Sequence, residues 1–143
     1  MSDLEITGRC LCGAVTYEAT SKNGRLGVCH CSDCQRWKGG PFIGLDVETI
    51  SIEGPVRWYS SSEWAERGSC SECGSALFWR MKDGRHQTVS AGSVDDPSAI
   101  KDIKSHIFID SKPDYYDFTG DAPRLTGEET LAMVMEQMKA EDA

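Results

Sequence analysis

Most of the chain alternates hydrophobic and polar positions over short stretches that end at turn residues, which is typical of β-strands. Gly54-Pro55 and Lys82-Asp83-Gly84 provide two of these turns. Alternating strands with Gly-rich turns predict a mainly β domain rather than a parallel α/β sheet. The predicted strands cover residues 15–18, 41–45, 50–53, 56–59, 76–80, 87–90 and 106–109.

Signals for helices are sparse before the last twenty residues of the chain. Residues 32–37 predict one helical turn, for which Ser32 or Asp33 is a suitable N-cap because both side chains can accept a backbone N–H. Residues 97–100, which begin with a proline, predict a second short turn.

A better helical pattern begins at Thr126. Glu129 follows three residues later, as in a capping box, and predicts a short C-terminal helix over about residues 127–140. Apolar residues recur there at helical spacing, so we interpret the methionines as packing residues rather than as part of a cofactor site. These residues are Leu131, Val134, Met135 and Met138.

Length and charge restrict the class of protein. A chain of 143 residues is sufficient for a single domain, and we predict one domain over residues 1–143. The formal net charge of −8 argues against partners that are polyanions, namely nucleic acid and anionic membrane surfaces. No apolar run approaches the ~20 residues that span a bilayer. Because residues 1–5 lack the pattern of a signal peptide, we expect a cytoplasmic protein.

The cysteines point to metal binding rather than to disulfides. Their number, seven, is odd, and a disulfide framework would leave one unpaired. Disulfides are also rare in the reducing cytosol. The cysteines cluster along the chain at spacings that suit convergence on a metal ion: Cys10 and Cys12, then Cys29, Cys31 and Cys34, then Cys70 and Cys73.

Two of the cysteine pairs each end in a glycine, as Cys10-Leu11-Cys12-Gly13 and Cys70-Ser71-Glu72-Cys73-Gly74. A glycine permits the tight turn that brings backbone N–H groups close to the thiolates. Together the pairs supply four sulfur ligands, the complement of a closed structural zinc site. Iron is the rival metal, but the spacing is not that of an iron–sulfur cluster.

The remaining cysteines, Cys29, Cys31 and Cys34, offer three thiolates and no obvious fourth ligand. Structural zinc normally has four protein ligands, whereas three ligands with a vacant position are typical of catalytic zinc. We therefore predict one structural and one catalytic zinc ion per chain, with Cys29, Cys31 and Cys34 as catalytic residues.

The histidines and Asp33 are weaker candidates for a fourth ligand. His30 lies between Cys29 and Cys31, and in an extended segment its side chain would point to the opposite face. His86 and His106 are remote in the sequence, so we interpret them as hydrogen-bonded structural residues. Asp33 suits a helix cap better than a ligand position.

Two cations follow the second group of cysteines. Arg36 and Lys38 could bind an anionic substrate in this otherwise acidic protein, and we name them as candidate substrate-binding residues. The alternative is an ordinary solvated face, which the sequence leaves open. We interpret Trp37, between them, as a core residue rather than a substrate platform.

The ordered motifs resemble those of the glutathione-dependent formaldehyde-activating enzyme family. They are Gly8-x-Cys10-x-Cys12-Gly13, Cys29-His30-Cys31-x-x-Cys34 and Cys70-x-x-Cys73-Gly74. The stretch from Ser105 to Asp117 also resembles a family signature, and the resemblance covers about residues 6–125. The chain is shorter than the founding members, and this tail is similar to that of members without an assigned substrate.

The resemblance implies small coiled β-sheets around zinc, similar to the fold of B-type methionine sulfoxide reductases. It implies a structural zinc on the two glycine-terminated pairs and a second zinc with an accessible position on Cys29, Cys31 and Cys34. It also implies a carbon–sulfur lyase of the S-hydroxymethylglutathione synthase type, which joins glutathione to formaldehyde. In such a reaction, His30 is a candidate to shuttle the thiol proton, since histidine titrates near neutral pH.

Two other classes of protein remain open at this point. A zinc-stabilised interaction module without catalysis would have a fourth protein ligand at the second site. A redox protein would form disulfides among Cys29, Cys31 and Cys34 and would lose metal on mild oxidation.

Overall fold

A computed structural model describes residues 3–142 of the chain, and these residues form a mainly β structure, as predicted. The chain divides into two compact units, one made of residues 3–26 and 43–102 and the other of residues 27–42 and 103–142. It passes from one unit to the other within strand β3 (Arg25–Cys29), at the start of β4 (Phe42–Val47) and within β10 (Asp102–Ile107). The single domain over residues 1–143 stays a prediction.

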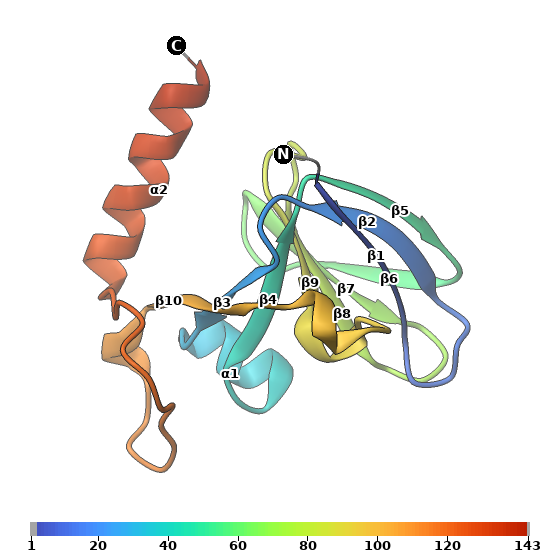
Figure 1. The fold of residues 1–143 in the computed structure, drawn as a ribbon, viewed down its shortest axis with the longest axis horizontal. Helices are drawn as coiled ribbons and strands as arrows, with labels where there is room; N and C mark the ends of the chain where they lie inside the picture. The colour runs from blue at the N-terminus through green and yellow to red at the C-terminus, as the bar shows by residue number, and fades with distance from the viewer. Residues whose placement is uncertain (1–2, 143) are drawn as a thin grey trace. The chain divides into compact units, whose positions relative to one another are not determined.

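The first unit contains two antiparallel arrangements of strands (Figure 1). In one of them β2 lies between β1 and β5. In the other, β4, β9, β8, β7 and β6 are neighbours in that order, so that β6 to β9 form a meander. The bounds are β1 Leu4–Arg9, β2 Thr16–Ser21, β5 Thr49–Glu53, β6 Val56–Ser60, β7 Ala65–Cys70, β8 Ala76–Met81 and β9 Gln87–Ser90, with short 3₁₀ helices at Ala91–Ser93 and Pro97–Ala99.

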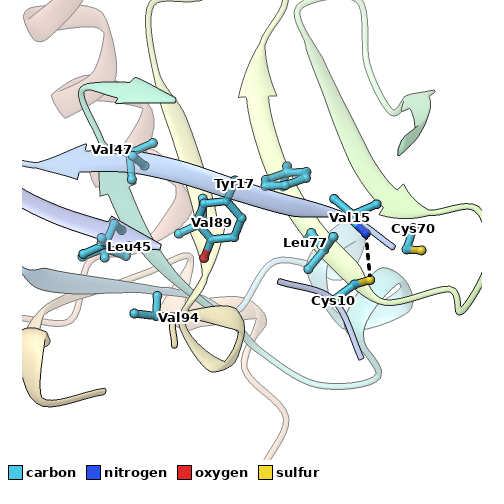
Figure 2. Packing of buried hydrophobic residues seen from close by; sticks show 12 residues of the cluster. Cys10, Val15, Tyr17, Leu45, Val47, Cys70, Leu77, Val89 and Val94 are labelled. Atoms are coloured by element: carbon cyan, nitrogen blue, oxygen red, sulfur yellow. Dashed lines mark hydrogen bonds between the residues drawn. The ribbon is translucent and has the colours of Figure 1, made fainter. Parts of the chain in front are cut away.

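The alternation of the strands supplies the core of this unit. Val15 and Val89 are fully buried, and the ring of Tyr17 packs edge-on against Phe78 with centroids 5.5 Å apart. Cys10 and Cys70 belong to the same buried cluster, at the end where Val15 and Leu77 lie (Figure 2). Two cysteines of the first group are therefore part of the hydrophobic core of the unit, whereas Cys12 is exposed and Cys73 is half-buried.

The second unit combines β3 and β10, which are neighbours, with helices α1 (Ser32–Lys38) and α2 (Gly127–Asp142) and a 3₁₀ turn at Ile109–Ser111. The backbone N–H of His30 donates to the carbonyl of Ile107 and so continues the pairing beyond β3. Among residues 3–142, no helix is long and apolar enough to cross a bilayer.

Several sequence predictions are confirmed and others need correction. The capping box is present, because the N–H of Thr126 donates to Glu129 and the N–H of Glu129 donates to the Thr126 hydroxyl. The apolar face of α2 is less buried than its spacing predicted, since Leu131 is 52% and Met135 is 62% exposed. The late strand ends at Ile107, because Phe108 has a left-handed backbone with a φ of 55°.

The N-cap of α1 is neither Ser32 nor Asp33. It is Cys31, whose Sγ accepts the N–H of Cys34 at 3.4 Å. A thiolate can replace the usual oxygen there because the orphan N–H groups of a helix N-terminus favour any anion. The cap of the helix is therefore also one of the candidate metal ligands.

Candidate metal centres

The first cysteine group consists of Cys10, Cys12, Cys70 and Cys73, and their four sulfurs lie within 4.8 Å of one another. The Sγ atoms of Cys10 and Cys12 are 3.7 Å apart, and those of Cys12 and Cys70 are 3.9 Å apart. A tetrahedron with Zn–S bonds of ~2.3 Å has edges of about 3.8 Å. The four sulfurs thus fit a tetrahedral zinc ion.

Backbone amides surround these sulfurs. The N–H of Val15 donates to Cys10 at 3.3 Å, and the N–H of Glu72 donates to Cys70 at 3.4 Å. The turns that place such amides need the predicted glycines, since Gly13 and Gly74 have φ values of 83° and 78°. Amide donors favour thiolate over thiol, which is the form that binds metal.

Cys73 shows the same preference for ionisation. The Ser75 hydroxyl lies 3.1 Å from its Sγ and lowers the pKa of Cys73 to about 5. The N–H of Ala14 acts to lower the pKa of Cys12, but burial and the three neighbouring thiols together raise it to about 11. Full ionisation of the four sulfurs therefore needs a cation, as a bound metal would provide.

The second cysteine group lies at the junction of β3 and α1. Cys29 ends the strand, Cys31 caps the helix, and Cys34 occupies the first turn and is buried. The three sulfurs lie within 4.8 Å of one another, and over residues 3–142 no His, Asp or Glu joins this group. The arrangement fits a metal ion with three protein ligands.

The electrostatics of the second group also favour a cation. The neighbouring thiols of Cys31 and Cys34, together with burial, raise the pKa of Cys29. Three thiolates this close repel one another, so full ionisation needs a compensating positive charge. A bound metal would provide that charge.

His30 is not among the ligand atoms that converge at the second group, as its position in an extended segment predicted. It is fully buried, and its ring nitrogens lie 2.8 Å from the Tyr116 hydroxyl and 2.9 Å from Nδ1 of His106. Burial and the neighbouring His106 lower the pKa of His30 to about 4, so that the ring is neutral at pH 7. Its role as a proton shuttle stays a prediction.

His106, although remote from His30 in the sequence, lies beside it in the structure. Its ring stacks on that of His30 with centroids 5.2 Å apart. It is nonetheless hydrogen-bonded, as predicted for a structural histidine. Tyr116 and Gln35 complete this environment and were not singled out from the sequence, although Tyr116 belongs to the stretch that carries the family resemblance.

Comparisons with known proteins show the family of the chain. A family model described as glutathione-dependent formaldehyde-activating enzyme matches residues 5–111. The chain belongs to this family. It is 28% identical over 134 residues to an uncharacterized lyase of Schizosaccharomyces pombe, covering 92% of this chain and 98% of the relative.

A solved structure supports the fold of this family member. The crystal structure of a Rhodobacter sphaeroides protein matches with a TM-score of 0.56 and 19% identity, covering 82% of this chain and 98% of that one. At this identity the likeness concerns the fold alone.

The two cations of α1 have different surroundings in this glutathione-dependent formaldehyde-activating family member. Arg36 is exposed, whereas Lys38 is half-buried with its Nζ over the rings of Trp37 and Phe42, 5.9 and 5.7 Å from their centroids. Burial lowers the pKa of Lys38, while nearby Cys34 acts in the opposite direction. Trp37, predicted as a core residue, is half-buried and packs edge-on against Phe42.

Proposed function

We propose that the protein is a zinc-dependent carbon–sulfur lyase that joins a small thiol such as glutathione to an aldehyde, in the manner of S-hydroxymethylglutathione synthase. The observation that carries this proposal is the second cysteine group, which brings three sulfurs together within 4.8 Å without a fourth His, Cys, Asp or Glu from residues 3–142. Membership of the family and the lyase relative support the same class of reaction.

Cys29, Cys31 and Cys34 would hold the second zinc ion, and the first cysteine group would hold a structural one, which gives two ions per chain. When bound, zinc lowers the pKa of a coordinating substrate thiol, so that the thiol becomes an anionic nucleophile. The sulfur of the substrate then forms a bond to the aldehyde carbon while the C=O π bond breaks. The proton that the thiol releases ends on the new hydroxyl.

Arg36 and Lys38 would bind the carboxylates of a thiol such as glutathione. Both lie on α1, within four residues of Cys34. The exposed Arg36 acts through water, so its contribution is small and depends on salt. Lys38 is half-buried and interacts electrostatically with Cys34. Its partial burial makes Lys38 the more important of the two residues in this proposal.

Exchange NMR tests the proposal directly. Zinc-loaded protein should speed the interconversion of glutathione with S-hydroxymethylglutathione in the presence of formaldehyde, in proportion to protein concentration. Cys34→Ser should abolish the acceleration. Ser32→Ala, on the exposed side of the same helix, is the matched control and should retain it. A wild-type protein with two zinc ions and no acceleration would contradict the proposal for this pair of substrates.

The Arg36→Ala and Lys38→Ala variants sharpen the substrate assignment. Removal of both cations should raise KM for glutathione by about three- to tenfold and leave KM for formaldehyde unchanged, with a smaller effect in high salt. If cysteamine, which lacks carboxylates, shows the same change in KM as glutathione, these residues do not bind the carboxylates.

A further inference from the structure

Four side chains form a continuous hydrogen-bonded chain beside the second cysteine group. His106 Nδ1 lies 2.9 Å from His30 Nε2, and His30 Nδ1 lies 2.8 Å from the Tyr116 hydroxyl. Gln35 Nε2 donates to the same hydroxyl at 2.7 Å. His30 is 0% and His106 is 2% exposed, so water does not substitute freely for these partners.

These hydrogen bonds contact both ends of the segment that carries the three sulfurs. His30 lies between Cys29 and Cys31, and Gln35 follows Cys34 directly. The Gln35 side chain also approaches the carbonyl of His30 at 3.4 Å, so one amide group contacts both the phenol and the backbone between two ligands. A single hydroxyl, that of Tyr116, thereby connects the strand end to the helix.

The position of the proton on His30 sets the direction of the hydrogen bonds among these side chains. A neutral imidazole carries one N–H, so His30 donates from one nitrogen and accepts at the other. If His106 donates to His30, then His30 donates to Tyr116; if Tyr116 donates to His30, then His30 donates to His106. Each arrangement satisfies both His30 nitrogens, and loss of either neighbour leaves a buried ring nitrogen without a partner.

We propose that Tyr116, His106 and Gln35 are positioning residues of the second cysteine group. Through His30 and α1 they orient Cys29, Cys31 and Cys34 so that the sulfurs converge on one metal ion. The inference rests on the proposed metal at this group. Outer partners that orient metal ligands typically change metal affinity by 10- to 100-fold when removed.

Zinc release to a colorimetric chelator tests the inference without any assay of catalysis. The wild-type protein should release its two ions in separate phases, the faster one from the second group. Tyr116→Phe should increase the faster rate by about 10- to 100-fold and leave the slower one unchanged. Tyr17→Phe is the matched control, since it removes another half-buried hydroxyl bond, at 2.7 Å to Ser93, from the first unit.

A conservative exchange separates positioning from general packing. His106→Asn keeps a polar atom near the place of Nδ1, and His106→Leu removes it while retaining an apolar side chain. Asn should restore most of the wild-type release rate, whereas Leu should match Tyr116→Phe. In cobalt-substituted protein, the d–d bands of the second site should shift for Leu and Phe but not for Asn.

The outcomes distinguish the two proposals. A wild-type protein that binds only one metal ion would contradict both the proposed function and this inference. If the wild type binds two ions and Tyr116→Phe, still folded by its melting curve, releases zinc within twofold of the wild-type rate, the inference alone is wrong. Equal acceleration in Tyr17→Phe would also overturn it. If Tyr116→Phe does not fold, equal release rates in His106→Asn and His106→Leu would overturn it.

Discussion

The two cysteine groups use the same ligand in contrasting settings. In the first, Cys10 and Cys70 belong to a hydrophobic core, and four sulfurs lie within 4.8 Å of one another, with separations of 3.7 Å between Cys10 and Cys12 and 3.9 Å between Cys12 and Cys70. In the second, three sulfurs lie on a strand end and a short helix, beside buried histidines and a tyrosine. The two groups thus differ in the number of sulfurs that converge and in the polarity of what surrounds them, and the proposed structural and catalytic roles rest on these two differences.

The largest expected difference between the groups is in folding. A structural zinc ion contributes about 10–16 kcal/mol in small zinc domains, which exceeds the net stability of most domains. Cys73→Ser should therefore unfold the first unit. Thermal melting and the dispersion of amide NMR signals measure this.

The corresponding variant in the second group is Cys34→Ser. It should leave a folded protein with one zinc ion instead of two and a melting temperature lowered by roughly 10 °C or less. Elemental analysis gives the metal count. Equal collapse of Cys73→Ser and Cys34→Ser would mean that both groups are structural, which would remove the contrast.

Glycine-to-alanine substitutions should also cost more unfolding free energy next to the first group than next to the second. A Cβ on Gly54, whose φ is 106°, would clash with the carbonyl oxygen of Ala14, next to the first group. Gly54→Ala should cost about 3 kcal/mol or more in unfolding free energy. Gly39, which ends α1 with a φ of 74°, has no atom within 4 Å of such a Cβ, so Gly39→Ala should cost about 1 kcal/mol. Chemical denaturation of both variants measures the difference, and equal costs would contradict the rigid setting of the first group.

Much of this contrast could be predicted from the sequence, because its cause is local. The spacing and glycines of Cys10-x-Cys12-Gly13 and Cys70-x-x-Cys73-Gly74 require tight turns, and the structure has them. The same spacing also divides the cysteines into one group of four and one group of three, as the structure has them. Strand alternation gave the mainly β class, although β1, β3 and β7 were missed, since Gly and charged residues weaken their pattern.

The histidine–tyrosine environment could not be predicted in the same way. His30 and His106 are 76 residues apart, and no periodic pattern relates them. Their contact arises because β3 and β10 are neighbours, which is a property of the topology rather than of either segment. The Cys31 cap was missed because cysteine is not among the preferred N-cap residues and acts here through a sulfur acceptor.

Acid should weaken the second unit through His30. The pKa of His30 is lowered from 6.5 to about 4 in the folded protein, chiefly by burial and then by His106. Its neutral form is favoured on folding, so this contribution is complete above pH 6.5 and is lost as the pH falls towards 4. The loss is of the order of 1–3 kcal/mol.

Melting temperatures between pH 7 and pH 4 measure this effect in wild type and His30→Gln. The variant should have the shallower dependence on pH, since glutamine does not titrate. Zinc content is measured at each pH in both proteins, and only pH values at which the two retain the same zinc are compared, so that the difference between the curves isolates the histidine. Parallel curves would show that His30 is already free to protonate in the folded state.

The most direct test of the central claim is whether the metal at the second group accepts a substrate thiol. In protein with cobalt at both groups, each Co–thiolate bond contributes to the charge-transfer absorption. Glutathione should intensify that band in the wild type, because a fourth sulfur joins Cys29, Cys31 and Cys34, and should leave it unchanged in Cys31→Ser. If neither glutathione nor any other small thiol alters the spectrum of folded wild-type protein, the second metal does not bind substrate, and the lyase mechanism proposed for it is wrong.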